Sequence, residues 1–234
     1  MHIPNGVDVT STTEESLREA EWAGLRSICF VERLTSSSRG TDAFAEVQSL
    51  RPMTDIEILT GLEVDFHDLR AHLEGPSWPD VDHVLISDQF LPSTDGPLSP
   101  LNVRSLLAHG AMTPHEVISR LVEATVAAMG LIEQSILVHP FSFLKRIGID
   151  ELLMTSAQLR QFADHARSTK TWVEVNEKWA CPGDRVIHEL VRRGVRIVAG
   201  SDSRVSESVG VYQHVRRVHD SLKAYSSPIA FDGN

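Results

Sequence analysis

An aspartate and an arginine follow an apolar run near the C-terminus, in the segment RIVAGSDSRVSESVG (196–210). Asp202 comes directly after the Gly200 end of that run, and a carboxylate at the end of a buried strand usually binds a metal ion or a polar substrate. Arg204 stands two residues later, where a second ligand would be expected. A guanidinium stays protonated and only donates hydrogen bonds, so Arg204 cannot ligate a metal. The pair predicts chemistry that involves a negatively charged molecule.

Polar or ionisable side chains follow the other apolar runs at similarly short distances: Thr10 and Thr12, Glu32 and Arg33, Glu63 and Asp65, Asp88 and Gln89, His139, and Glu174 and Asn176. In α/β barrels the active site lies at the C-terminal ends of the strands. We therefore expect these side chains to meet in one site.

The elements that must position these residues alternate between strand-like and helix-like patterns. Strands are predicted at 6–11, 27–31, 56–66 with a bend at Gly61, 82–87, 135–140, 171–176 and 195–202. Helices are predicted at 12–24, 113–130, 156–169 and 184–194, the first two with capping boxes formed by Thr12 with Glu15 and by Thr113 with Glu116. Strands separated by helical crossovers imply a parallel sheet. About seven strands in a chain of this length, without a Gly-rich phosphate loop, favour a closed α/β barrel over a doubly wound sheet.

Two polar stretches interrupt this pattern, at 35–43 and 91–103. The part from 91 to 102 is so rich in Pro and Gly that we predict no regular element there. Both stretches are candidates for lids over the site.

The composition is that of an ordinary globular protein, with 234 residues and a formal net charge of −10. This charge argues against a nucleic-acid partner, which needs a basic surface. We see no membrane span and no secretory signal, and the two cysteines, Cys29 and Cys181, fit a reduced protein; we expect a cytoplasmic location. No break in the pattern divides the chain, so we predict one domain over 1–234.

Four motifs in order, TGLEVDF, ILVHPF, WVEVN and GVRIVAGSDSR, resemble the PHP (polymerase and histidinol phosphatase) family. The strand ends of that family carry a Gly-x-Glu, a His-Pro, a Glu-x-Asn and a Gly-Ser-Asp-x-His. The resemblance covers nearly the whole chain. It implies an α/β fold of the PHP type, a distorted TIM-like (β/α)7 barrel, and hydrolysis of phosphate esters with two or three divalent metals.

The match to the metal-ligand positions of the family is partial. Glu63 stands at the position of the bridging glutamate, His139 at that of the His-Pro ligand and Asp202 at that of the Ser-Asp ligand. Other positions are replaced. The opening His-x-His of the family is Thr10 and Thr12 in one alignment and His2 and Pro4 in another. The Asp-His after the second strand is Glu32-Arg33, the histidine after the fourth strand is Gln89, and the last histidine is Arg204. The resemblance therefore implies a degenerate member of the family.

These replacements favour an anion site in place of a full metal centre. We predict that Arg33 and Arg204 take the place of one metal as bidentate clamps on an anion, with Gln89, Asn176 and Lys178 as further substrate-binding residues. Structural alternatives stay open: Arg33 forms an ion pair near Glu32 or with Asp202 that closes an inactive site, Asn176 terminates its strand, and Lys178 packs with Trp179 in a loop.

Glu63, His139 and Asp202 are the predicted catalytic residues. They could ligate one divalent ion (Mn, Zn or Fe) with room for water, or act without a metal, His139 serving as acid or base and a carboxylate orienting it. A core role for His139, bonded to the backbone, is the structural alternative.

Three functions fit these features. The first is a PHP-like hydrolase that acts on a small anionic metabolite, a phosphate ester above all, with a reduced or absent metal centre. The second is a metal-independent acid–base enzyme (a lyase, cyclase or isomerase) of metabolite biosynthesis. The third is a non-catalytic scaffold that binds a ligand or a partner, because a fold does not determine its chemistry.

Overall fold

The computed structural model describes residues 11–34, 43–75 and 80–226. The predicted first strand, with both alignments of the His-x-His motif, falls on residues 1–10 and lies outside the described residues, apart from Ser11 and Thr12. The first candidate lid, 35–43, lies outside them except for Ala43.

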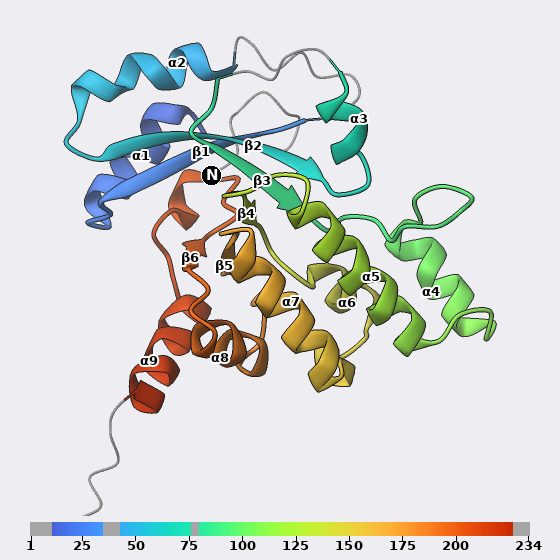
Figure 1. Cartoon of the computed structure of the whole chain (residues 1–234). Helices are drawn as coiled ribbons and strands as arrows, with labels where there is room; N and C mark the ends of the chain where they lie inside the picture. The colour runs from blue at the N-terminus through green and yellow to red at the C-terminus, as the bar shows by residue number, and fades with distance from the viewer. Residues whose placement is uncertain (1–10, 35–42, 76–79, 227–234) are drawn as a thin grey trace, which may run out of the picture.

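The described strands form one parallel sheet that curls into a half-barrel (Figure 1). Its six strands follow one another in chain order: β1 (Ser27–Arg33), β2 (Glu57–Asp65), β3 (His83–Ser87), β4 (Ile136–Leu137), β5 (Trp172–Asn176) and β6 (Ile197–Gly200). Among the described residues, β1 and β6 are the edges and do not pair with each other. The predicted parallel α/β sheet is confirmed, and the seventh strand and the closed barrel stay predictions.

Helices connect the strands and cover the outside of the curl. They are α1 (Thr13–Trp22), α2 (Ala43–Leu50), α3 (Leu69–Leu73), α4 (Pro100–Ala108), α5 (Pro114–Met129), α6 (Ser142–Ile147), α7 (Ser156–Ser168), α8 (Asp184–Arg192) and α9 (His214–Ser226), with 3₁₀ turns at Arg51–Met53, Glu151–Leu153 and Ser206–Ser208. Figure 1 shows α5, α7 and α8 in succession along one side of the molecule, where α5 contacts α7 and α7 contacts α8. The capping boxes predicted at Thr12 and Thr113 are both present.

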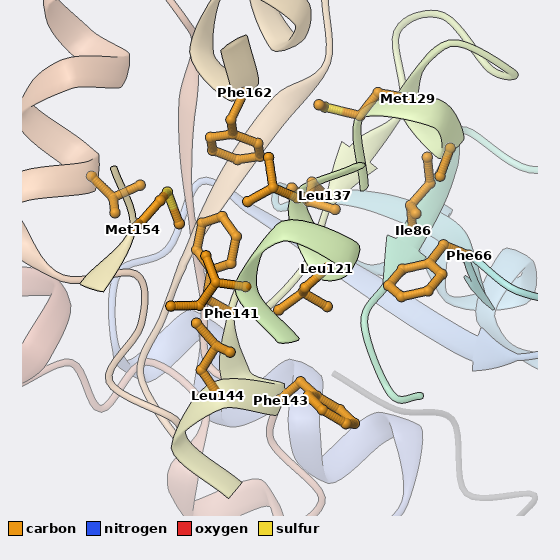
Figure 2. Packing of buried hydrophobic residues seen from close by; sticks show 14 of the residues in the cluster. Phe66, Ile86, Leu121, Met129, Leu137, Phe141, Phe143, Leu144, Met154 and Phe162 are labelled. Carbon is orange, nitrogen blue, oxygen red and sulfur yellow. The ribbon is translucent and has the colours of Figure 1, made fainter. Parts of the chain in front are cut away.

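The main core lies between these helices and the outer face of the sheet. Ile86 of β3 and Leu137 of β4 lie in one cluster with Leu121 of α5 and Phe162 of α7 (Figure 2). Leu62 of β2 belongs to the same cluster. Each of these side chains is fully buried, which favours folding by roughly 1.5–3 kcal/mol per side chain. Residues on the opposite face, such as Val31, Leu85 and Val138, form a separate small cluster inside the curl.

Three local expectations are wrong. Strand β2 runs unbroken through Gly61, where a Cβ would lie 2.6 Å from Leu85 Cδ1, so this glycine serves close packing and not a bend. The stretch 91–102 is partly regular, because Leu91 and Leu98 form an antiparallel bridge and α4 begins at Pro100, capped by Ser99. The strands predicted at 135–140 and 195–202 end early, since the chain turns into left-handed conformations at His139 (φ 35°) and Asp202 (φ 49°).

No helix in the described part of the chain is both long and apolar enough to cross a bilayer.

Candidate active site

Side-chain alternation places several predicted residues on the inner face of the curled sheet. Successive strand residues point to opposite faces, so Glu63 points away from the core that buries its neighbours Leu62 and Val64. Arg33, at the end of β1, is the register partner of Glu63 in β2. The parallel strands end at the same edge, and this edge carries the site.

A cavity of about 190 Å³ opens at this edge. It is lined by Arg33, Glu63, Gln89, His139, Arg146, Lys178, Trp179, Asp202 and Arg204. The sequence analysis predicted seven of these as site residues, and the fold brings them together from β1, β2 and the segments that follow β3, β4, β5 and β6.

The His139 ring lies between two buried carboxylates. Its Nδ1 is 3.0 Å from Ser142 Oγ and 3.4 Å from Asp88 Oδ1, and Ser142 donates a 3.0 Å hydrogen bond to the same Asp88 oxygen. Because the serine proton goes to Asp88, Nδ1 must donate to Ser142, which we assign from this network. The other nitrogen, Nε2, faces Glu63 Oε1 at 3.7 Å and lies at the cavity.

These contacts favour a protonated imidazole. Burial alone would lower the pKa of His139, but the hydrogen bonds and negative charges of Asp88 and Glu63 outweigh it and raise the pKa well above its ordinary value. Burial also raises the pKa of Asp88, whose Oδ2 has no hydrogen-bond partner among the described residues. His139 and its carboxylate neighbours can therefore exchange a proton with a molecule in the cavity.

Glu174 fixes the backbone of His139. Its Oε2 accepts hydrogen bonds from the His139 backbone N at 2.5 Å and from Asn176 Nδ2 at 3.1 Å. Its Oε1 lies against Gly200, where a Cβ would be only 1.5 Å away, so β6 must carry glycine at this point. The left-handed turn at His139 is thus held by a carboxylate from the neighbouring strand.

Asp65 fixes the segment after β3 in a similar way. It accepts 2.5 Å contacts from the Gln89 backbone N and from His67 Nδ1. Gln89 in turn donates from Nε2 to Glu63 Oε1 at 3.3 Å. This contact orients Glu63 toward the cavity.

The four cations of the cavity have different environments. Lys178 forms an ion pair with Asp202, with 3.0 Å between Nζ and Oδ2, so the predicted alternative in which Asp202 pairs with Arg33 is not the pairing found. Within the described residues, neither Arg33 nor Arg146 forms an ion pair. Arg146 was not predicted: it lies two helical turns beyond His139, and no motif marks it.

Asn176 is the predicted site residue that does not line this cavity in the described structure. It is fully buried; its amide donates to Glu174, and its oxygen accepts from the Trp179 backbone N at 2.9 Å. It supports the turn that presents Lys178 and Trp179, in line with the strand-terminating alternative. Asp88 and Ser142, which the sequence reasoning missed as partners of His139, could be found only from the fold.

The described residues do not fit the multi-metal centre that the PHP resemblance implies. They contain no group of three or more His, Cys, Asp or Glu side chains arranged to hold a metal ion, although Glu63, His139 and Asp202 line one cavity. Asp202 is paired with Lys178, and Arg33, Arg146 and Arg204 line the same cavity, where they would repel further dications. A single bound divalent ion and a site without a metal both stay predictions.

At the C-terminal strand ends of a parallel α/β half-barrel, a histidine between carboxylates thus faces a cavity lined by four basic side chains. A scan against models of known protein families matches none to this chain. The chain is 24% identical, over 212 residues, to probable phosphatases of Thermoanaerobacter sp. strain X514 and Thermoanaerobacter pseudethanolicus, covering 89% of this chain and 78% of each relative.

A solved structure has a similar fold. It is a histidinol phosphate phosphatase from Lactococcus lactis, complexed with zinc, L-histidinol and phosphate, with a TM-score of 0.65, 18% identity, and coverage of 94% of this chain and 91% of that one. The fold is therefore PHP-like. Together with the phosphatase-named relatives, it supports a hydrolase of the phosphoesterase type, as the sequence analysis predicted.

Proposed function

We propose that the chain hydrolyses a small phosphate ester, with Arg33 and Arg204 holding the phosphoryl group and Glu63, His139 and Asp202 moving protons. The observation that carries this proposal is the cavity itself, in which four basic side chains surround an imidazole placed between carboxylates. Guanidinium forks match the non-bridging oxygens of a phosphoryl group and stabilise the charge that it carries in the transition state.

His139 would supply the proton that the leaving group needs. A water oxygen attacks phosphorus as the bond from phosphorus to the ester oxygen breaks, and Nε2–H of His139 gives its proton to that oxygen. The water proton passes to a carboxylate of the cavity, Glu63 or Asp202. Asp88 and Ser142 keep Nδ1 occupied, so that Nε2 is the nitrogen that reacts.

The test is an assay of the purified protein on p-nitrophenyl phosphate, with and without a chelator, beside elemental analysis of its metal content. We expect hydrolysis that His139→Asn and Glu63→Gln each reduce by about 100-fold or more. Arg204→Ala should reduce kcat/KM by about tenfold or more through the loss of a charged hydrogen bond. Arg167→Ala, at an exposed position on α7, is the matched control.

The outcomes separate the alternatives. Hydrolysis that a chelator abolishes and Mn, Zn or Fe restores supports a bound metal in the same site. Hydrolysis that survives His139→Asn contradicts the proposed role of His139. Absence of hydrolysis, together with phosphate binding that depends on Arg204, favours the acid–base enzyme or the scaffold.

A further inference from the structure

Arg146 reaches the cavity from a different direction than the predicted clamps. It lies on α6, donates from Nη1 to the Gln89 carbonyl at 3.5 Å, and stands over the Trp179 ring with its Cζ 6.0 Å from the ring centroid. Gln89 follows β3 and Trp179 follows β5, and both strands lie between the edge strands of the described sheet. Arg33 ends β1 and Arg204 follows β6, and these strands are the two edges of the described sheet. The basic side chains therefore reach the cavity both from the edges and from the middle of the sheet.

No carboxylate of the described residues forms an ion pair with Arg146. Four arginines elsewhere in the described chain do form ion pairs, Arg51 with Asp82, Arg192 with Glu189, Arg193 with Asp164, and Arg217 with Asp184, whereas Arg146 lines the cavity without one. Arg146 is half-buried, and burial lowers its pKa; the negative charge of Asp88 opposes this effect, and the positive charge of Arg33 adds to it to a smaller degree. A partly desolvated cation beside another cation is costly, and an anionic group placed between Trp179 and Gln89 would relieve that cost.

The cavity shares Glu63, His139 and Asp202 with a second cavity of about 230 Å³ inside the curl, and by itself it accommodates a small ligand. Its volume of about 190 Å³ is below the roughly 300–1,000 Å³ of pockets that hold drug-sized ligands. A molecule of a few heavy atoms with two acidic ends matches both the volume and the two sets of cations.

We propose that Arg146, supported by Trp179, is a second anion subsite, so that the substrate is a small phosphate ester that also carries a carboxylate or a second phosphate. This inference rests on the proposed function for the identity of the first group. The guanidinium fork of Arg146 binds the second acid group, and Trp179 holds that fork in place.

The experiment compares kcat/KM for ethyl phosphate, phosphoglycolate and ethylene glycol bisphosphate. All three share an ester phosphate, and the last two add a carboxylate or a second phosphate. The ratio of kcat/KM for a two-acid ester to that for ethyl phosphate should fall by about tenfold or more in Arg146→Ala. In Arg33→Ala both values should fall together and the ratio should change little. The ester with the higher ratio identifies the second acid group.

Arg167→Ala and the thermal unfolding of each variant control for general effects on the fold, and Arg146→Lys should restore part of the ratio. A ratio that is the same in the wild-type protein and in Arg146→Ala overturns the proposal. If the wild-type protein hydrolyses none of the esters, the proposed function fails separately. Calorimetric binding of phosphoglycolate and ethyl phosphate then measures the same ratio, and equal effects of Arg146→Ala on both ligands overturn the subsite.

Discussion

Buried carboxylates decide the chemistry of His139. Asp88 and Glu63 lie on opposite sides of its ring, at 3.4 Å from Nδ1 and 3.7 Å from Nε2. A charged imidazole compensates these carboxylates, whereas a neutral one would leave two buried negative charges near each other. The same contacts that make His139 a proton donor therefore also contribute to the stability of the fold.

The stability of the protein should fall as the pH rises above neutrality. The pKa of His139 is raised in the native state, so its contribution is fully present below its unfolded value of about 6.5 and is lost as the pH rises through the native value. Asp88→Asn removes one of the charges that raise this pKa, so the fall in stability above about pH 6.5 should be smaller in that variant. Urea unfolding at a series of pH values measures both dependences. An equal dependence in the two proteins would contradict the role given to Asp88.

Strands β5 and β6 pack closely against each other where Glu174 lies against Gly200. The Glu174 carboxylate occupies the space that a side chain on Gly200 would need, and in return it holds the His139 backbone. Gly61 of β2 also stands at a close contact, but its nearest neighbour is the mobile end of Leu85. The two glycines differ in how far the neighbouring atoms can move.

Gly200→Ala should therefore cost more than Gly61→Ala. We expect the first to lower the free energy of unfolding by about 1–3 kcal/mol, in the range of overpacked sites, and the second to lower it by less. Displacement of Glu174 should also reduce any phosphatase activity of Gly200→Ala, because the turn at His139 would shift. Urea unfolding and the p-nitrophenyl phosphate assay test this. A larger loss of stability in Gly61→Ala would refute the matched fit of Glu174 and Gly200.

For the whole molecule, the contrast between overall and local charge is the main feature. The chain carries a formal net charge of −10, yet four basic side chains surround one small cavity. A local positive potential in an acidic protein attracts small anions, whereas the acidic surface disfavours large polyanions. This contrast agrees with the sequence-based prediction of a small anionic substrate, and the exclusion of nucleic acid stays a prediction.

Inorganic phosphate should stabilise the protein against heat. At about 100 times its dissociation constant, a ligand that binds only the native state adds about 2.7 kcal/mol. For a chain of this size that corresponds to roughly 5–10 °C in the melting temperature. The shift should be lost in the double variant Arg33→Ala with Arg204→Ala, with sodium chloride of equal ionic strength as the control. A shift of the same size in the variant would place the anion elsewhere.

The sequence by itself determined the parallel α/β sheet, the two capping boxes and most residues of the cavity. These features depend on local patterns: alternation within strands, helix-start residues, and polar side chains directly after apolar runs. Such patterns are visible in a few consecutive residues. The one-domain organisation stays a prediction, and so does a site with one metal ion or none.

Only the tertiary structure decided which side chains meet. In that structure Asp88 and Ser142 contact His139, and Asp202 forms its ion pair with Lys178 and not with Arg33. Arg146 lies over the Trp179 ring, and the Asn176 side chain binds Glu174. These contacts depend on how the strands curl and on the left-handed turns at His139 and Asp202. The physical reason is that each contact joins segments from different strand ends, and their distance is set by the packing of the whole sheet and not by the residues near either partner.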